Sequence, residues 1–129
     1  MNTPILPPTM APPAANYVHA MLSTGASRIL HTSGVVPTAP DGSTPTDIAE
    51  QAEVVWQNIT AILNEADLLI SDVVSITTYV VVDHLASLGL VMAARDRAMG
   101  DHRAASTLVT VPALARPEWQ MEIAVVAVA

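Results

Sequence analysis

The most constraining feature of this 129-residue sequence is a pair of valine-rich segments with apolar side chains on both alternating faces. Residues 72–82 read DVVSITTYVVV, and residues 119–128 read WQMEIAVVAV. Successive side chains of a strand point to opposite faces, so this pattern predicts strands that are covered on both sides. The chain must therefore form a sheet with a layer on each face, and its length is typical of one domain.

The segment 48–66 has the residue spacing of an amphipathic helix. Its apolar side chains recur at intervals of three and four, namely Ile48, Ala52, Val55, Trp56, Ile59, Ile62, Leu63 and Ala66. Asp47, followed three residues later by Glu50, resembles a capping box at the start of this helix.

A second helix is predicted from His84 to about Met99, between the two valine-rich segments. Asp83 can cap its start, and Gly100 can end it. Its inward face is expected to carry Leu85, Leu88, Val91 and Met92.

Shorter segments complete the predicted sheet. Residues 17–22 and 28–32 read as two strands, and the Ser-Thr-Gly-Ala-Ser turn between them predicts a β-hairpin. Residues 104–111 form another strand, so the expected element order is β-β-α-β-α-β-β. This order defines an α/β fold, also classed as α+β, with one mixed sheet. Right-handed crossovers would place both helices on one face of it.

The other face of that sheet has no covering element within the chain. Another copy of the subunit is the simplest source of the missing layer. Only 13% of the residues are charged, which is low for a small monomer with this much apolar surface. We therefore expect an oligomer. Residues 1–15 are rich in proline and lack periodicity, so they are expected to be an extended lead-in to a domain formed by residues 16–129.

The composition excludes several classes of function. The absence of cysteine excludes disulfides, thiolate catalysis and cysteine-bound metal. The absence of lysine excludes Schiff-base catalysis. The net charge of −7 argues against binding to nucleic acid. No apolar run reaches the ~18 residues of a membrane helix, and no signal or transit peptide is recognisable, so the cytoplasm is the expected location.

Glu122 is the most informative single residue. In the last strand, alternation puts it on the same face as Ala124, Val126 and Val128. A carboxylate on an apolar face is costly unless it is paired or lines a wet cavity, and its burial would raise the pKa into a range useful for acid–base chemistry. Alternatively, Glu122 lies near a strand end, where it is solvated or paired with an arginine.

Other polar residues give weaker signals. The four histidines, His19, His31, His84 and His102, have no HxH or HxxxH spacing, so no metal site is expected. Ser33 and Gly34 end a predicted strand and could present a hydroxyl and backbone N–H groups to a ligand. They are equally the residues that an ordinary turn requires.

Several stretches of the sequence match a known family pattern. The segments ANYVHA (15–20) and RILHTSGVVP (28–37) resemble a GPYSQA-like segment followed by a strand that ends in SGQIP. The helix with Glu50-Gln51, the strand that begins Asp72-Val73-Val74, and the closing segments STLVTV (106–111) and MEIA (121–124) continue the pattern. Together these stretches, from about Tyr17 to Val128, resemble the RidA family, also called YjgF or L-PSP.

The resemblance implies a chorismate-mutase-like fold that forms a homotrimer with ligand clefts between subunits. It also implies hydrolysis of a reactive enamine or imine, such as 2-aminoacrylate or 2-iminopropanoate, to a keto acid and ammonia without cofactor or metal. In this family a glutamate positions the attacking water, and an arginine holds the substrate carboxylate as a bidentate pair. By matching position, Glu122, Ser33 and Tyr17 would be catalytic, and Gly34 would bind substrate.

The sequence departs from the family pattern where the arginine belongs. Ser106 stands at that position, and Leu108 stands where many members have a cysteine; both are expected to line the substrate site. A serine hydroxyl cannot supply the charged hydrogen bonds of a guanidinium, worth roughly 1.5–3 kcal/mol each. Arg103, three residues upstream, is a candidate replacement from the loop, and the alternative is that it is a surface charge.

The sequence therefore predicts a hydrolytic deaminase for a small imine or enamine whose carboxylate, if present, is not anchored in the usual way. The alternative is a non-catalytic trimer that binds a small metabolite or a partner protein in the same clefts. The ribonuclease activity sometimes attached to the family's name is disfavoured by the net charge of −7.

Overall fold

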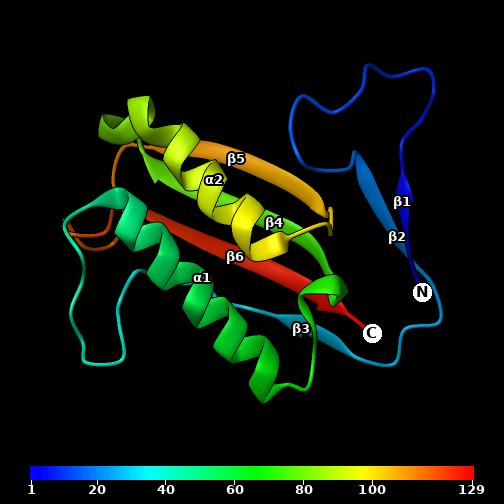
Figure 1. The fold of residues 1–129 in the computed structure, drawn as a ribbon, viewed down its shortest axis with the longest axis horizontal. Helices are drawn as coiled ribbons and strands as arrows, with labels where there is room; N and C mark the ends of the chain where they lie inside the picture. The colour runs from blue at the N-terminus through cyan, green and yellow to red at the C-terminus, as the bar shows by residue number, and fades with distance from the viewer.

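A computed structural model describes all residues, 1–129, as a mixed sheet with two helices packed on one face (Figure 1). The elements in chain order are β1 (Asn2–Ile5), β2 (Ala20–Ser23), β3 (Ile29–His31), α1 (Ile48–Glu65), the 3-10 helix η1 (Ile70–Asp72), β4 (Val73–Val81), the 3-10 helix η2 (Val82–Ser87), α2 (Leu88–Met99), β5 (Ala105–Val111) and β6 (Met121–Val128). Four strands form the main sheet in the order β3-β6-β4-β5, and only the pair β4 and β5 is parallel. The predicted fold class is confirmed.

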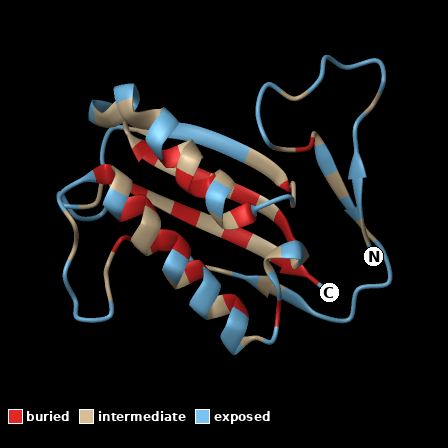
Figure 2. Ribbon diagram, in the orientation of Figure 1, coloured by how far each residue is buried: buried red, intermediate tan, exposed pale blue.

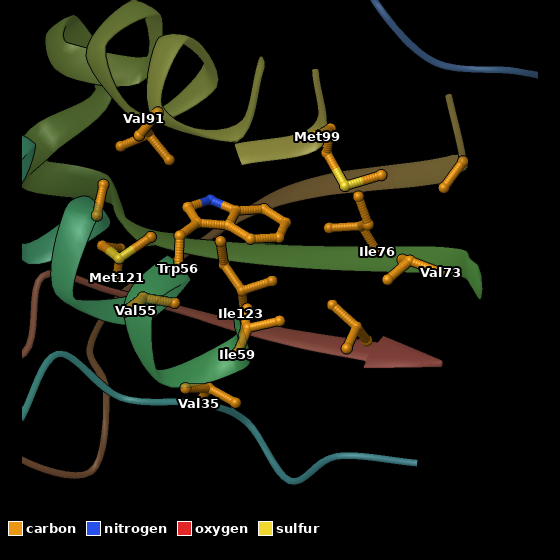
Figure 3. Close-up of a cluster of buried hydrophobic side chains, with 14 of the residues drawn as sticks. Val35, Val55, Trp56, Ile59, Val73, Ile76, Val91, Met99, Met121 and Ile123 are labelled. Carbon is orange, nitrogen blue, oxygen red and sulfur yellow. The ribbon is translucent and has the colours of Figure 1, made fainter. Parts of the chain in front are cut away.

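Helix α1 forms where its periodicity predicts. The side chain of Asp47 accepts a hydrogen bond from the backbone N–H of Ala49 and so caps the first turn. The apolar stripe is buried against the sheet. Figure 3 shows Trp56 lying over the strands, with Val91 and Met99 of α2 and Ile76 of β4 around its ring. The burial of this stripe fixes α1 on β6 and against α2.

The second helix begins later than the sequence predicts. Residues 82–87 form the 3-10 turn η2, in which His84 has non-helical backbone angles, and regular α-helix starts only at Leu88. Leu85, expected on the inward face, is therefore 54% exposed, because the tighter 3-10 turn rotates it away from the sheet. The end is as predicted, since Gly100 follows Met99 with a positive φ of 57°.

The predicted hairpin between the segments 17–22 and 28–32 is wrong. Strand β2 pairs with β1, so that Asn2 lies opposite Ser23, while β3 pairs with β6. The turn residues at 23–27 allow a hairpin, but long-range pairing decides otherwise. The Asn2 amide donates to the Val128 carbonyl and accepts from the Ser23 hydroxyl, which ties β1 to both β2 and the last strand. Residues 2–5, expected within the lead-in, thus form a strand.

The β1–β2 pair lies past one end of the main sheet, beside the start of β5 and the end of β6. The backbone N–H of Val18 donates to the Ala104 carbonyl, and Val18 forms a bridge with Ala105, so the chain before β2 runs beside the start of β5. Strand β3 lies beyond β6, at the sheet edge opposite β5. Figure 1 shows the blue N-terminal strands beside the end of α2 and the start of β5.

The two faces of the sheet differ in burial. In β6 the residues under the helices, Met121, Ile123, Val125 and Ala127, are buried, and their alternating neighbours Glu122, Ala124 and Val126 are only partly buried. Figure 2 shows this alternation along β4 and β6, and it shows β5 exposed over much of its length. No helix covers the second face, which we call the open face. Neither helix combines the length and the hydrophobicity that a bilayer crossing requires.

Candidate functional site

A β-bulge interrupts the chain after β3 at Ser33 and Gly34. His31 lies opposite Val126, and Val35 forms a bridge with Ile123. The three residues 32–34 therefore lie opposite only two residues of β6, 124 and 125. The backbone N–H of Val35 donates to the Ile123 carbonyl at 2.7 Å, which re-establishes the pairing beyond the bulge. The N–H groups of Ser33 and Gly34 have no hydrogen-bond partner within the chain. Bulges of this kind re-aim the backbone and often lie next to functional sites.

The Glu122 carboxylate lies directly against this bulge. Alternation puts Glu122 on the open face, opposite Tyr79 of β4. A Cβ atom built on Gly34 would overlap the carboxylate, with the Glu122 Cδ atom only 2.9 Å away. The three ion pairs of the chain, Arg95–Asp96, Arg97–Glu53 and Arg116–Glu118, leave Glu122 out. Glu122 therefore pairs with no arginine of its own chain, which leaves a wet cavity or a solvated strand end as the two interpretations of this residue.

Two side chains of α1 hold the surroundings of Glu122 in place. The buried amide of Gln51 donates to the Glu118 carbonyl and accepts from the N–H of Gln120, which fixes the approach to β6. The amide of Asn58 donates to the carbonyls of Val36 and Thr38, which fixes the chain after the bulge. An open groove of about 610 Å³ lies between this chain and α1 and is lined by His31, Thr32, Ser33, Gly34, Val35, Val36, Thr38, Asn58, Ala61 and Ile62.

Tyr17 lies at the other end of the sheet. Its neighbour Val18 bridges to Ala105, which is opposite Ser75, whereas Glu122 is opposite Tyr79. Those positions on β4 differ by four residues, which is about 13 Å along a strand. The chain therefore does not bring Tyr17 and Glu122 together. We call the surroundings of Glu122, Ser33 and Gly34 the Glu122 end, and the surroundings of Tyr17 the Tyr17 end.

His19 contacts Tyr17 at its own end of the sheet. The two rings meet edge to face with centroids 6.3 Å apart. The Tyr17 hydroxyl accepts from the N–H of Ala14, and Nε2 of His19 lies 2.8 Å from the carbonyl oxygen of Ala11. Because a carbonyl oxygen only accepts, Nε2 carries a proton in this contact.

The residues expected around the family's arginine position lie elsewhere. Ser106 is opposite the buried Ile76, on the helix-covered face, and its hydroxyl accepts from Nη1 of Arg95 at 3.3 Å. Leu108 is on the same face as Ser106 by alternation. The Arg103 guanidinium donates to the carbonyls of its own loop, at Gly100 and His102. Ser106 and Leu108 are therefore not on the open face with Glu122, and the Arg103 guanidinium is engaged by its own loop.

Asn58 and Tyr79 are the site residues that sequence reasoning missed. Alternation along residues 72–82 puts Tyr79 on one face of its strand, but only the register shows that it is opposite Glu122. Asn58 is a polar residue beside an apolar stripe, which is a usable signal for a side chain that anchors a loop.

No three histidine, aspartate or glutamate side chains are close enough together to hold a metal ion. In the loop before α1, the hydroxyl and the N–H of Ser43 both donate to Asp41 and hold the pKa of that carboxyl below its usual value.

A family model described as "Endoribonuclease L-PSP" matches residues 8–129. The chain belongs to this family. A structure of YyfB from Yersinia pestis, described as a protein of the conserved Rid family, resembles this L-PSP member with a TM-score of 0.88 and 31% identity over 99% of this chain and 98% of that one. The YjgF gene product of E. coli gives 0.71 and 28% identity over 98% of each chain.

Another L-PSP-like structure is E. coli TdcF, solved with bound serine. It gives a TM-score of 0.69 and 25% identity over 96% of this chain and 93% of that chain. No curated protein sequence matches the chain significantly. The resemblance inferred from the sequence motifs is confirmed, and so is the L-PSP fold that it implies.

Proposed function

We propose that this L-PSP family member is a hydrolytic deaminase that acts on a small, reactive imine or enamine. The observation that carries the proposal is the Glu122 carboxylate, which pairs with no arginine and lies against Gly34. The free N–H groups of Ser33 and Gly34 add hydrogen-bond donors next to that carboxylate. A carboxylate beside free donors suits a base that activates water while the donors hold a polar substrate group. The serine bound to E. coli TdcF supports a small ligand of similar size.

The proposed reaction balances without cofactor or metal. The oxygen of a water molecule bonds to the carbon of a protonated imine, Glu122 takes a proton from that water, and the C=N electron pair becomes the lone pair of an amine. Glu122 then returns the proton to the nitrogen. The C–N bond breaks as the hydroxyl oxygen forms C=O, and the hydroxyl proton passes to the departing ammonia. An iminium ion and water thus become a carbonyl compound and ammonium.

We propose that the cleft lies between two copies of the chain in a homotrimer. The open face carries apolar side chains such as Ala124 and Val126 that no helix covers. Tyr17 and Glu122 are separated along the sheet within one chain, so the Tyr17 end of one copy would have to meet the Glu122 end of another. A cyclic assembly repeats this contact once per subunit.

We further propose that the substrate is not held by a carboxylate–arginine pair at the usual place. Each of the five arginines already has partners: Arg28 donates to the carbonyls of Ala66 and Asp67, Arg95 to Asp96 and Ser106, Arg97 to Glu53, and Arg103 to Gly100 and His102, while Arg116 lies over Trp119 and near Glu118. The donors of the bulge are the remaining candidates for holding a polar group of the substrate.

The lack of a free arginine also favours one alternative, a non-catalytic trimer that binds a small metabolite in the same clefts. A binding protein needs neither a charged anchor for a reacting carboxylate nor a general base. Cleavage of RNA, which the family's description suggests, is disfavoured by the net charge of −7.

The test measures the release of ammonia and carbonyl product from imines generated in solution, with and without a carboxylate. Glu122→Gln keeps the shape but removes the base, so turnover should fall by ~10²–10⁴-fold. Glu65→Gln, on an exposed glutamate of α1, is the control and should leave turnover unchanged. Equal turnover in the two variants would refute the role of Glu122 as the base. Wild-type protein that binds serine but turns over no imine would favour the alternative.

A further inference from the structure

Arg95 of α2 is the only charged residue of the chain that is buried, with an exposed fraction of 3%. Its guanidinium has partners at all three nitrogen atoms. Nε and Nη2 donate to Oδ1 of Asp96 at 3.1 and 3.0 Å, and Nη1 donates to the Ser106 hydroxyl at 3.3 Å. A buried guanidinium requires such partners, since an unpaired charge away from water is strongly destabilising.

The network continues from Asp96 to the segment that carries Tyr17. The second carboxylate oxygen, Oδ2 of Asp96, accepts from the side-chain amide of Asn16 at 3.0 Å. Asn16 directly precedes Tyr17, and on the other side the N–H of Val18 donates to the Ala104 carbonyl at 3.1 Å. Tyr17 is therefore bracketed by one contact to α2 and one to the start of β5.

We propose that Asp96, oriented by Arg95, is a positioning residue that holds Tyr17 in place through Asn16. Both oxygens of the carboxylate are engaged, one by Arg95 and one by Asn16, so Asp96 has a single orientation. Ser106 belongs to this network as a partner of Arg95 rather than to the substrate site. That Tyr17 lines a cleft rests on the proposed function, but its positioning by Asp96 does not.

The consequence for Tyr17 is a fixed hydroxyl with a proton to donate. Its oxygen accepts from the N–H of Ala14, so its own O–H is free to point toward a bound ligand. Without the Asn16–Asp96 contact, Val18 alone holds this segment beside the start of β5, through its N–H group and its buried side chain. The Tyr17 ring would then move relative to β5.

The positioning can be tested without any substrate. The chain has two tyrosines, Tyr17 and Tyr79, so 3-fluorotyrosine labelling gives two ¹⁹F resonances, and Tyr17→Phe assigns them. Asn16→Ala removes an exposed side chain and leaves the ion pair between the buried Arg95 and the partly exposed Asp96 intact. We expect it to shift or broaden the Tyr17 resonance, with the Tyr79 resonance and the melting temperature unchanged.

Asn64→Ala, which removes an exposed amide of α1 that makes no hydrogen bond, is the matched control and should move neither resonance. An unmoved Tyr17 resonance in Asn16→Ala would overturn the proposal.

In the deaminase assay, Asn16→Ala should lower kcat by about tenfold through misplacement of Tyr17, and should cause no further loss in a Tyr17→Phe background. If Asn16→Ala lowers kcat equally in the wild type and in the Tyr17→Phe variant, the positioning proposal is also overturned. If the wild-type protein has no activity, the proposed function fails, whereas the ¹⁹F result still decides the positioning.

Discussion

The Glu122 end and the Tyr17 end are held in place by different physical means. At the Glu122 end, backbone pairing on both sides of a bulge puts Gly34 against a carboxylate, and two amides of α1 fix the flanking loops. At the Tyr17 end, a buried guanidinium and a chain of side-chain hydrogen bonds hold a segment that belongs to no strand. The first arrangement depends mostly on the sheet. The second depends on single side chains and is therefore easier to disturb.

Disrupting the open face should have the largest effect, because it would separate the Tyr17 end of one copy from the Glu122 end of another. Val126 is partly buried on that face, so Val126→Asp leaves the monomer core intact but would place a charge in the proposed interface. We expect trimers for the wild type and monomers for this variant in sedimentation, with loss of all turnover. Thr60→Asp, on the exposed side of α1, should remain trimeric. A trimeric Val126→Asp would place the interface elsewhere.

Filling the space at Gly34 should disturb the Glu122 end alone. Gly34 does not have a positive φ, so alanine is not strained there, but its methyl group would displace the Glu122 carboxylate. We expect Gly34→Ala to lower kcat by roughly 10²-fold and to leave the ¹⁹F signal of Tyr17 unchanged. Gly89→Ala, at a glycine of α2 with open space around it, should not lower activity. Full activity of Gly34→Ala would remove Glu122 from the reaction.

Adding an arginine tests which face of β5 belongs to the cleft. Ala105 is on the open face near Val18, whereas Ser106 is under the helices against Arg95. Ala105→Arg should raise kcat/KM for a carboxylate-bearing imine by roughly tenfold, since a charged hydrogen bond is worth ~1.5–3 kcal/mol. Ser106→Arg should lower the melting temperature without any gain, because it sets two guanidinium groups against each other.

Arg103→Ala provides the comparison for both variants. Its guanidinium donates to loop carbonyls, so its loss should leave turnover of acidic imines unchanged. A strong loss would show that Arg103 anchors the substrate after all.

Local patterns in the sequence predicted most of the fold and the face of the sheet that carries Glu122. The periodicity of α1, the bounds of β4 and the face of Glu122 follow from spacing alone. The partners of β2 and β3 do not, because a permissive turn cannot reveal that residues 2–5 pair with β2. The face of Ser106 was equally hidden, since a shift of one residue in register moves a side chain to the other face.

The central claim is that the Tyr17 end of one copy completes the Glu122 end of another. Co-expression of Tyr17→Phe with Glu122→Gln tests it directly, because each variant lacks one of the two residues. If the cleft forms between copies, about one in four clefts of randomly mixed trimers regains both residues. The mixture should then show far more activity than either variant alone. Activity that remains at the level of the separate variants, in trimers shown to be mixed, would contradict the claim.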